Sequence, residues 1–204
     1  AGGVNPLAFL AGPVVAKYDA DPAGSQVADL AGCLDNANRR VRSLTGELDW
    51  DYGNGLCTLN APKAQGATGF LAKAGAIRLG AVEITCANDY ATVLAVSLDN
   101  QPLASAARVL LQVGTVERPT GWATRPVTLQ DGGQAKPGEE VVSFGKAPWR
   151  IREADLTVKL SNPALTTAEV LDANGMVVRQ IPLEAAAGGK LLRFPADALY
   201  VVVR

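Results

Sequence analysis

Short stretches in which apolar and polar residues alternate make up most of the chain. They are rich in Val, Leu, Ile and Thr, and Gly, Pro, Asn and Asp separate them at intervals of about ten residues, which is typical of an antiparallel sandwich or barrel. The pattern predicts strands at 13–18, 39–44, 46–51, 56–60, 76–79, 81–86, 90–98, 107–115, 127–130, 140–144, 155–160, 168–172, 176–181, 190–194 and 199–204. Only 26–38 favours a short helix, which Gly32 weakens. We therefore predict an all-β fold, an antiparallel β-sandwich of immunoglobulin-like or jelly-roll-like type.

The regular spacing of strands and turns is interrupted after residue 116. Between 117 and 150 the alternation is broken by several glycines and by Pro119, Pro126, Pro137 and Pro148. Such a composition favours a loop-rich connection with two short strands. We expect a main β-sandwich unit at 1–116, a Pro/Gly-rich connection at 117–150, and a smaller C-terminal β unit at 151–204 that packs on the first.

The stretch GELDWDYGNGLCTLN at 46–60 places three acidic side chains beside a tryptophan and a tyrosine. Paired carboxylates are what glycoside hydrolases use to cleave sugars. With 52–55 as a four-residue loop, however, strand alternation separates an apolar face from an acidic face. The apolar face holds Leu48, Trp50, Cys57 and Leu59, and the other holds Glu47, Asp49, Asp51 and Thr58. Because the acids project from one strand and do not oppose each other across a cleft, a structural hairpin is favoured over a polar site.

Composition and charge mainly exclude certain classes of protein and of partner. With 48% hydrophobic and 19% charged residues the chain is globular rather than disordered. Its net charge is −1, and its charges are scattered, so we expect no nucleic-acid partner, which would need a clustered basic face. No apolar stretch reaches membrane-spanning length, so we expect no membrane partner. Since the chain begins Ala-Gly-Gly without methionine, we expect a processed chain or a piece of a longer protein.

Histidine is absent from the sequence. This excludes Ser-His-Asp and Cys-His catalysis and nearly every zinc or copper site. Cys33, Cys57 and Cys86 form no CxxC pair, and we interpret them as free thiols, with one disulfide as the alternative. We expect no cofactor. A structural calcium ion stays open as an alternative, because oxygen ligands occur in predicted loops at Asp19, Asp21, Asp131, Glu139 and Glu140.

Aromatic side chains in predicted loops are candidates for sugar binding, because their rings stack on the apolar faces of pyranoses and planar polar side chains assist them. Two tryptophans lie in the Pro/Gly-rich connection with arginines close by in the sequence. The candidate ligand-binding residues are Trp122, Trp149, Tyr52, Arg118, Arg125 and Arg150. The alternative for the tryptophans is that each fills the seam between two β units.

Three stretches of the chain resemble a known region: LTGELDWDYGNGLCTLNAPKAQGATGFL, NDYATVLAVSLDNQPLASAARVLLQVGT and ERPTGW. The matching residues are Thr45–Asp51, Thr58–Pro62, Gln65, Ala91–Val93, Ser97–Asp99, Pro102, Leu103 and Leu110–Thr115. They are similar to the β-rich C-terminal accessory region of large bacterial clan-A-like glycoside hydrolases, of the cellulase, β-galactosidase and agarase type. In such proteins a catalytic barrel holds the two catalytic carboxylates. The resemblance implies an accessory module without catalytic residues, because this chain has no β/α alternation from which a barrel is built.

These observations favour a non-catalytic, carbohydrate-binding accessory module of a secreted or periplasmic bacterial glycoside hydrolase. Its expected partners are a polysaccharide or oligosaccharide and a catalytic barrel domain absent from this chain. Two alternatives stay open. One is a purely structural or protein-interaction β domain, and the other is a hydrolase or lyase that works without histidine.

Overall fold

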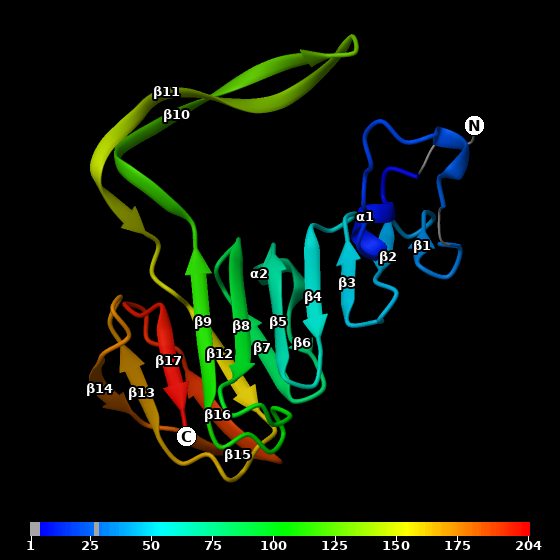
Figure 1. Ribbon diagram of the computed structural model, residues 1–204. Helices are drawn as coiled ribbons and strands as arrows, with labels where there is room; N and C mark the ends of the chain where they lie inside the picture. Colours follow the sequence, from blue (N-terminus) through cyan, green and yellow to red (C-terminus); the bar gives the residue numbers. More distant parts are fainter. Residues whose placement is uncertain (1–4, 27–28) are drawn as a thin grey trace. The chain divides into compact units, whose positions relative to one another are not determined.

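The computed structural model describes residues 5–26 and 29–204, and antiparallel strands dominate it (Figure 1). The chain divides into two compact units, one made of the residues up to Gly114 together with Ala154–Arg204 and the other of Thr115–Glu153. Each unit has its own sheets, all of them open. The prediction of an all-β fold is confirmed.

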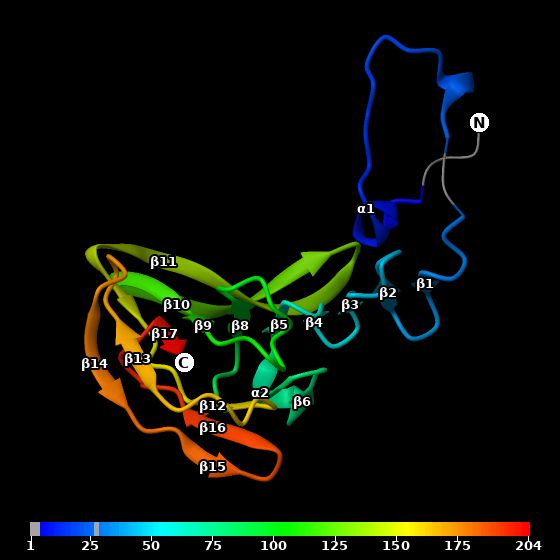
Figure 2. The same ribbon diagram turned by 60° about the horizontal axis from the view of Figure 1, so that its bottom comes forward.

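The first unit contains two antiparallel sheets. The ten-stranded sheet has the order β1 (Leu34–Asp35), β2 (Arg40–Arg42), β3 (Leu48–Asp51), β4 (Leu56–Asn60), β5 (Ala64–Gly69), β8 (Ala91–Ser97), β9 (Val109–Thr115), β17 (Tyr200–Val203), β13 (Ala168–Leu171) and β14 (Val177–Ile181). The five-stranded sheet has the order β15 (Glu184–Ala186), β16 (Gly189–Arg193), β12 (Leu156–Leu160), β7 (Val82–Cys86) and β6 (Ile77–Arg78). Figure 2 shows β15 and β16 in a layer separate from β5, β8 and β9.

The two sheets share one hydrophobic core. Alternate residues of β8, β9 and β12 are buried, as expected for strands with one face toward a core, and the last three residues of β17 are all buried. The cluster joins both sheets, and its largest fully buried members include Ile84, Val93, Leu111, Val158, Leu160 and Leu192. Each such side chain contributes about 1.5–3 kcal/mol when it leaves water. This face-to-face packing is consistent with the predicted β-sandwich.

Two buried polar side chains connect segments around this core. Gln65 Oε1 accepts a hydrogen bond from the Ala81 amide at 2.7 Å, and its Nε2 donates to the Ala61 carbonyl at 3.2 Å. Asn162 Nδ2 donates to the Ala106 carbonyl at 2.9 Å, and its Oδ1 accepts from the Ala164 amide at 3.1 Å. Because their polar groups are satisfied, these side chains are buried without a large penalty.

The C-terminal residues do not form a separate β unit. Strands β13, β14 and β17 extend the ten-stranded sheet, and β12 pairs with β7, so 154–204 and the residues up to Gly114 build one unit together. The domain boundaries expected from the prolines at 117–150 therefore differ from the division that the structure shows. The physical reason is that neither part can cover its apolar strand faces without the other.

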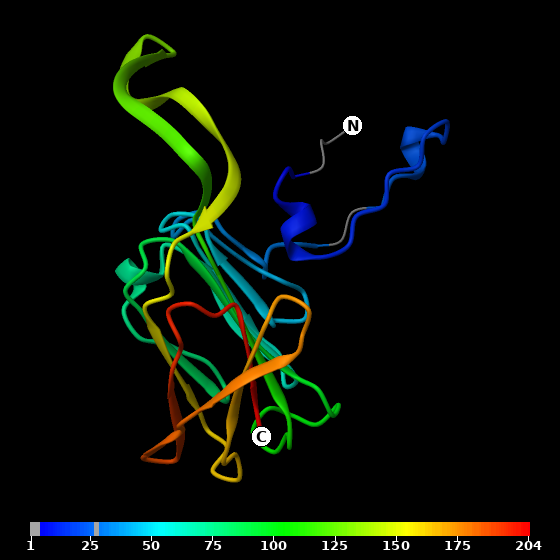
Figure 3. The ribbon, with the colours of Figure 1, turned by 90° about the vertical axis from the view of Figure 1, so that its left-hand side faces the viewer.

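The second unit is a two-stranded antiparallel ribbon, β10 (Glu117–Asp131) and β11 (Gln134–Ile151), where a loop-rich connection was expected. Gly132 and Gly133 form its tip with φ values of 56° and 79°, the conformation of a tight two-residue hairpin turn. Prolines are tolerated because each strand of such a ribbon has one unpaired edge. Figure 3 shows the ribbon twisted and curved, as two-stranded ribbons are.

Helices are few and short among the described residues. They are α1 (Ala8–Ala11), the 3₁₀ turn η1 (Pro22–Gly24) and α2 (Leu71–Ala74). None of the helices in the part of the chain that the structure describes is long and apolar enough to span a membrane.

Two predicted elements near the N-terminus are wrong. Residues 13–18 have no strand partner, and Val15 and Tyr18 are 80% and 90% exposed. The helix expected at 26–38 is absent from 29–38, which hold turns and β1; residues 27 and 28 lie outside the described part. Asp35 accepts hydrogen bonds from the amide and side chain of Asn38, which favours a turn over a helix.

The close approach of β5 to β8 generates a stability prediction. A Cβ on Gly66 would lie 2.2 Å from the Val93 carbonyl oxygen, whereas a Cβ on Gly114 in β9 would meet nothing within 4 Å. Gly66→Ala should therefore lower the free energy of unfolding by about 1–3 kcal/mol, the range of an overpacked core. Gly114→Ala, the matched control, should change it by less than about 0.5 kcal/mol. Urea unfolding measures both, and equal stabilities for the two variants would contradict the predicted contact.

Candidate functional site

The ribbon brings three of the six predicted binding residues together near its open end. Arg118 lies opposite Arg150 in the register of β10 and β11, and both line a hollow of about 300 Å³ with Trp122. The complete lining is Val116, Arg118, Pro119, Gly121, Trp122, Arg150, Ile151 and Arg152. All of these residues belong to the second unit, so the hollow is formed within the ribbon itself. We call this hollow the ribbon-base site.

Aromatic and cationic contacts fix the side chains of the ribbon-base site. The Arg118 guanidinium lies 5.1 Å from the centre of the Trp122 ring, which is a cation–π contact. The Trp122 and Phe144 rings meet edge to face, with centres 5.8 Å apart and planes at 81°. Arg118 Nη1 also donates to the Glu117 carbonyl at 2.8 Å. The arginine head and the indole are thus held side by side.

Irregularities in the ribbon place these residues opposite each other. The register shifts after Pro119, where β11 has two additional residues, Ala147 and Pro148, joined by a cis peptide bond. Thr120 Oγ1 donates to the Pro148 carbonyl at 2.8 Å across this irregularity. A second shift follows Ala123. Bulges re-aim side chains and increase the local twist of a strand pair.

The other three predicted residues lie elsewhere. Trp149 is opposite Pro119 and adjacent to Arg150, so alternation places it on the other face of the ribbon, where it is 62% exposed. Arg125 Nε donates to Glu140 Oε2 at 2.7 Å farther along the ribbon. Tyr52 belongs to the first unit. The structure therefore divides the predicted set among four places.

Phe144 and Lys146 belong to the same ribbon face, and the sequence analysis did not select them. Phe144 is opposite Trp122 and Lys146 is opposite Thr120, which places both on the face of Arg118. The Gly132-Gly133 turn is a signal from which the hairpin register can be counted. The irregularity between Ala123 and Thr124, however, shifts that register before it reaches Phe144.

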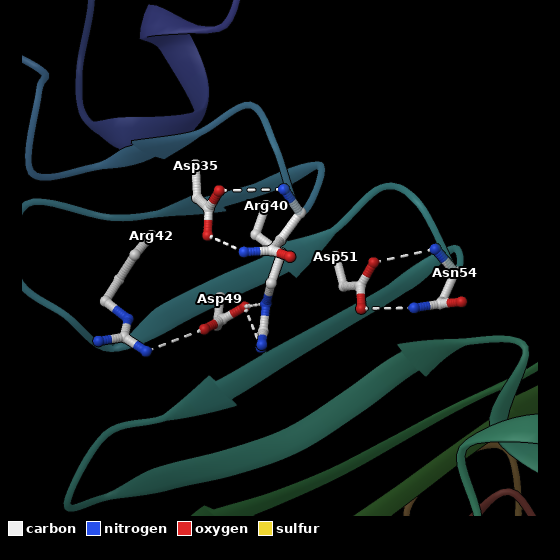
Figure 4. Close-up of polar contacts among 7 residues, drawn as sticks. Asp35, Arg40, Arg42, Asp49, Asp51 and Asn54 are labelled. Atoms are coloured by element: carbon white, nitrogen blue, oxygen red, sulfur yellow. Dashed lines mark hydrogen bonds and ion pairs between the residues drawn. The ribbon is translucent and has the colours of Figure 1, made fainter.

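The acidic hairpin at 46–60 has the predicted register and is a structural element. Asp51 pairs with Leu56, Trp50 with Cys57, Asp49 with Thr58 and Leu48 with Leu59. Asp49 lies between two cations, with Arg40 Nη2 at 2.8 Å and Arg42 Nη2 at 3.2 Å (Figure 4). Its carboxylate is thus occupied by ion pairs. Tyr52, in the turn of this hairpin, contacts Trp50, with ring centres 5.7 Å apart.

Asp51 lacks the properties of a catalytic acid. Its carboxylate accepts hydrogen bonds from the Asn54 side chain at 2.8 Å and the Asn54 amide at 2.9 Å (Figure 4). These bonds, led by the side-chain one, lower the pKa of Asp51 below its ordinary value. A general acid for glycoside cleavage needs a raised pKa. The hydrogen bonds instead identify Asp51 as a turn-capping residue.

The cysteines and acidic loops also have structural explanations. All three cysteines are free thiols, and burial raises the pKa of Cys57 and Cys86, which disfavours the reactive thiolate. The described residues include no group of three or more His, Cys, Asp or Glu side chains arranged to hold a metal ion. Of the acids considered for calcium, Asp131 pairs with Lys136 and Glu140 with Arg125.

Comparison with protein-family models, curated proteins and solved structures finds no match to this chain.

The Asp51 turn generates a pH prediction. In Asn54→Ala the side-chain donor is lost, so the pKa of Asp51 should rise toward its ordinary value of about 3.9. Because the folded pKa is lowered, the stability from this carboxylate is present above about pH 4 and is lost as pH falls through the folded pKa. An NMR titration of the side-chain carboxyl carbons measures the change. Asp99, which Ser97 holds in another turn, is the internal control and should keep its pKa. An unchanged Asp51 pKa in the variant would contradict the assigned cause.

Proposed function

We propose that this chain is a non-catalytic accessory β-sandwich module that binds a polysaccharide or oligosaccharide at the ribbon-base site. The observation that supports the proposal is that Trp122, with the Arg118 guanidinium 5.1 Å from its ring centre, lines a hollow together with Arg118 and Arg150. An indole offers apolar surface to the C–H face of a sugar ring. Each guanidinium offers five N–H donors in a fixed plane, which suits hydroxyl oxygens.

The surroundings of the ribbon-base site support binding rather than cleavage. Its described lining contains no aspartate or glutamate. Farther along the ribbon, Glu140 and Asp131 are each paired with a cation at 2.6 Å and 2.5 Å. Glycoside cleavage requires two carboxyl groups about 5–10 Å apart on either side of the bond. A binding role needs no such pair.

The biological context comes from the resemblance of the sequence to accessory regions of bacterial glycoside hydrolases. It does not come from the geometry of the ribbon-base site. We propose that the module belongs to a secreted or periplasmic bacterial glycoside hydrolase and serves a catalytic barrel outside this sequence. In that arrangement, glycan binding at the ribbon-base site would hold substrate near the barrel and raise its effective concentration there.

A second function, docking to another protein surface, is favoured by the apolar exposure of the ribbon. Phe144 is 72% exposed, Trp149 is 62% exposed and Val142 is 52% exposed. Exposed apolar groups of this size commonly mark interaction surfaces. This function predicts that sugars leave the ribbon unaffected.

A binding panel tests the proposed function. The purified chain is incubated with insoluble and soluble cellulose, xylan, mannan, β-glucan, agarose and pectin, and the retained fraction is measured. Trp122→Ala should weaken binding to the retained glycan about tenfold or more, the equivalent of at least 1.4 kcal/mol. Trp149→Ala, which removes the tryptophan on the other face, should keep wild-type affinity.

Thermal unfolding of both variants provides the folding control for this panel. Absence of wild-type retention on every glycan, or equal binding by a folded Trp122→Ala variant, would refute the proposed function. The first of these outcomes would favour the docking function.

A further inference from the structure

Charged residues are distributed unevenly along the ribbon. Toward the tip, each of two cations has a carboxylate partner: Arg125 pairs with Glu140 and Lys136 pairs with Asp131. At the other end, Arg118, Lys146, Arg150 and Arg152 take part in none of the carboxylate ion pairs among the described residues. The base of the ribbon therefore holds an excess of positive charge, with these four cations against the carboxylates of Glu117 and Glu153.

Strand register concentrates this charge on one face. Arg118 lies directly opposite Arg150, and Lys146 lies opposite Thr120 on the same face. Arg152 lines the hollow with both arginines. Like charges directly opposite each other on a strand pair are destabilising. An anion between the two guanidiniums would remove that repulsion.

The acid that precedes Arg118 in the sequence does not compensate this cation. Glu117 precedes Arg118 and lies opposite Ile151, so alternation places its side chain on the other face. The Arg118 guanidinium is meanwhile held over Trp122 at 5.1 Å, which fixes the cation beside the aromatic surface. A ligand that occupies the hollow thus meets an indole and a pair of planar cations together.

We propose that the ribbon-base site binds an acidic saccharide, with a carboxylate or sulfate group between Arg118 and Arg150 and the sugar ring against Trp122. This inference rests on the proposed glycan-binding function and specifies its ligand class. Guanidinium groups bind carboxylate and sulfate-like oxyanions through paired N–H donors, and these charge-assisted bonds are about twice as strong as neutral ones. Uronate carboxylates and sulfate esters share this anionic oxygen chemistry.

The observations favour a saccharide over a nucleic acid. A nucleic-acid surface needs basic residues spread along a backbone path, whereas here the cations gather at one hollow and the chain as a whole has a net charge of −1. One or two anionic groups per ligand match the Arg118–Arg150 pair.

Calorimetry with matched ligands tests the inference. The wild-type chain is titrated with oligogalacturonate and with its methyl ester, which has the same sugar backbone without the charge. A second pair, sulfated carrageenan oligosaccharide and its desulfated form, distinguishes sulfate from carboxylate as the bound group. One charged form should bind at least about tenfold more tightly than its neutral partner, as expected for an added hydrogen bond to a charged group. Its affinity should fall as salt rises from 50 to 200 mM.

Charge-removing variants locate the anion. Arg150→Gln should reduce the affinity for the charged form about tenfold and leave the affinity for its neutral partner unchanged. Arg125→Gln is the matched control, because its guanidinium is already paired with Glu140, and it should bind as the wild type does. Thermal unfolding confirms that both variants fold.

Three other outcomes of these titrations would contradict the inference. Equal binding of charged and neutral forms would overturn the acidic ligand class and leave the proposed glycan-binding function intact. Binding of no saccharide would overturn both. Tighter binding of a single-stranded oligonucleotide than of any acidic saccharide would overturn the inference and identify a nucleic-acid site.

Discussion

The packing of the five-stranded sheet against the inner face of the ten-stranded sheet is the contact on which the structure depends. Strand β12 is central to it, since Val158 and Leu160 are almost fully buried and the strand pairs with both β7 and β16. Because β9 belongs to one sheet and β12 to the other, the chain between them leaves one layer and returns to a different one. Most of the intervening residues pair with each other as the ribbon.

This arrangement explains the exposure of apolar side chains on the ribbon. A two-stranded ribbon cannot bury a face between layers, so its aromatic and aliphatic side chains stay accessible, as the exposure of Phe144 shows. In the sandwich, polar side chains are occupied: Asp49 by two arginines and Gln65 by backbone groups. At the ribbon base, the Arg118 guanidinium lies 5.1 Å from the centre of the Trp122 ring and takes part in none of the ion pairs among the described residues. A ligand with both a sugar ring and an anionic group would contact both the indole and the guanidinium.

Much of the sandwich could be predicted from sequence because its strands alternate clearly. The hairpin around Trp50 has the predicted register, and 56–60 coincides with β4. Strand β5 was missed because its sequence, AQGATG, consists of small residues, and close backbone approach at Gly66 is what requires them. The ribbon was expected to be a loop-rich connection because its prolines suggest loops. In the structure, the unpaired edge of each ribbon strand accommodates these prolines. Arg118 lies opposite Arg150 because the register shifts by one residue after Ala123 and by two residues after Pro119, and no local sequence pattern specifies these shifts.

The chain's three tryptophans provide the most direct measurement of the central claim, that the ribbon base is the binding site. Their indole N–H groups give separate signals in ¹⁵N–¹H NMR spectra, assigned by single Trp→Phe variants and followed during titration with acidic oligosaccharides. The account predicts a saturable shift of the Trp122 signal, while the signal of Trp50 in the sandwich hairpin stays unchanged. If the Trp122 signal stays in place at saturating ligand, or if only the Trp50 signal moves, the ribbon base is not the site.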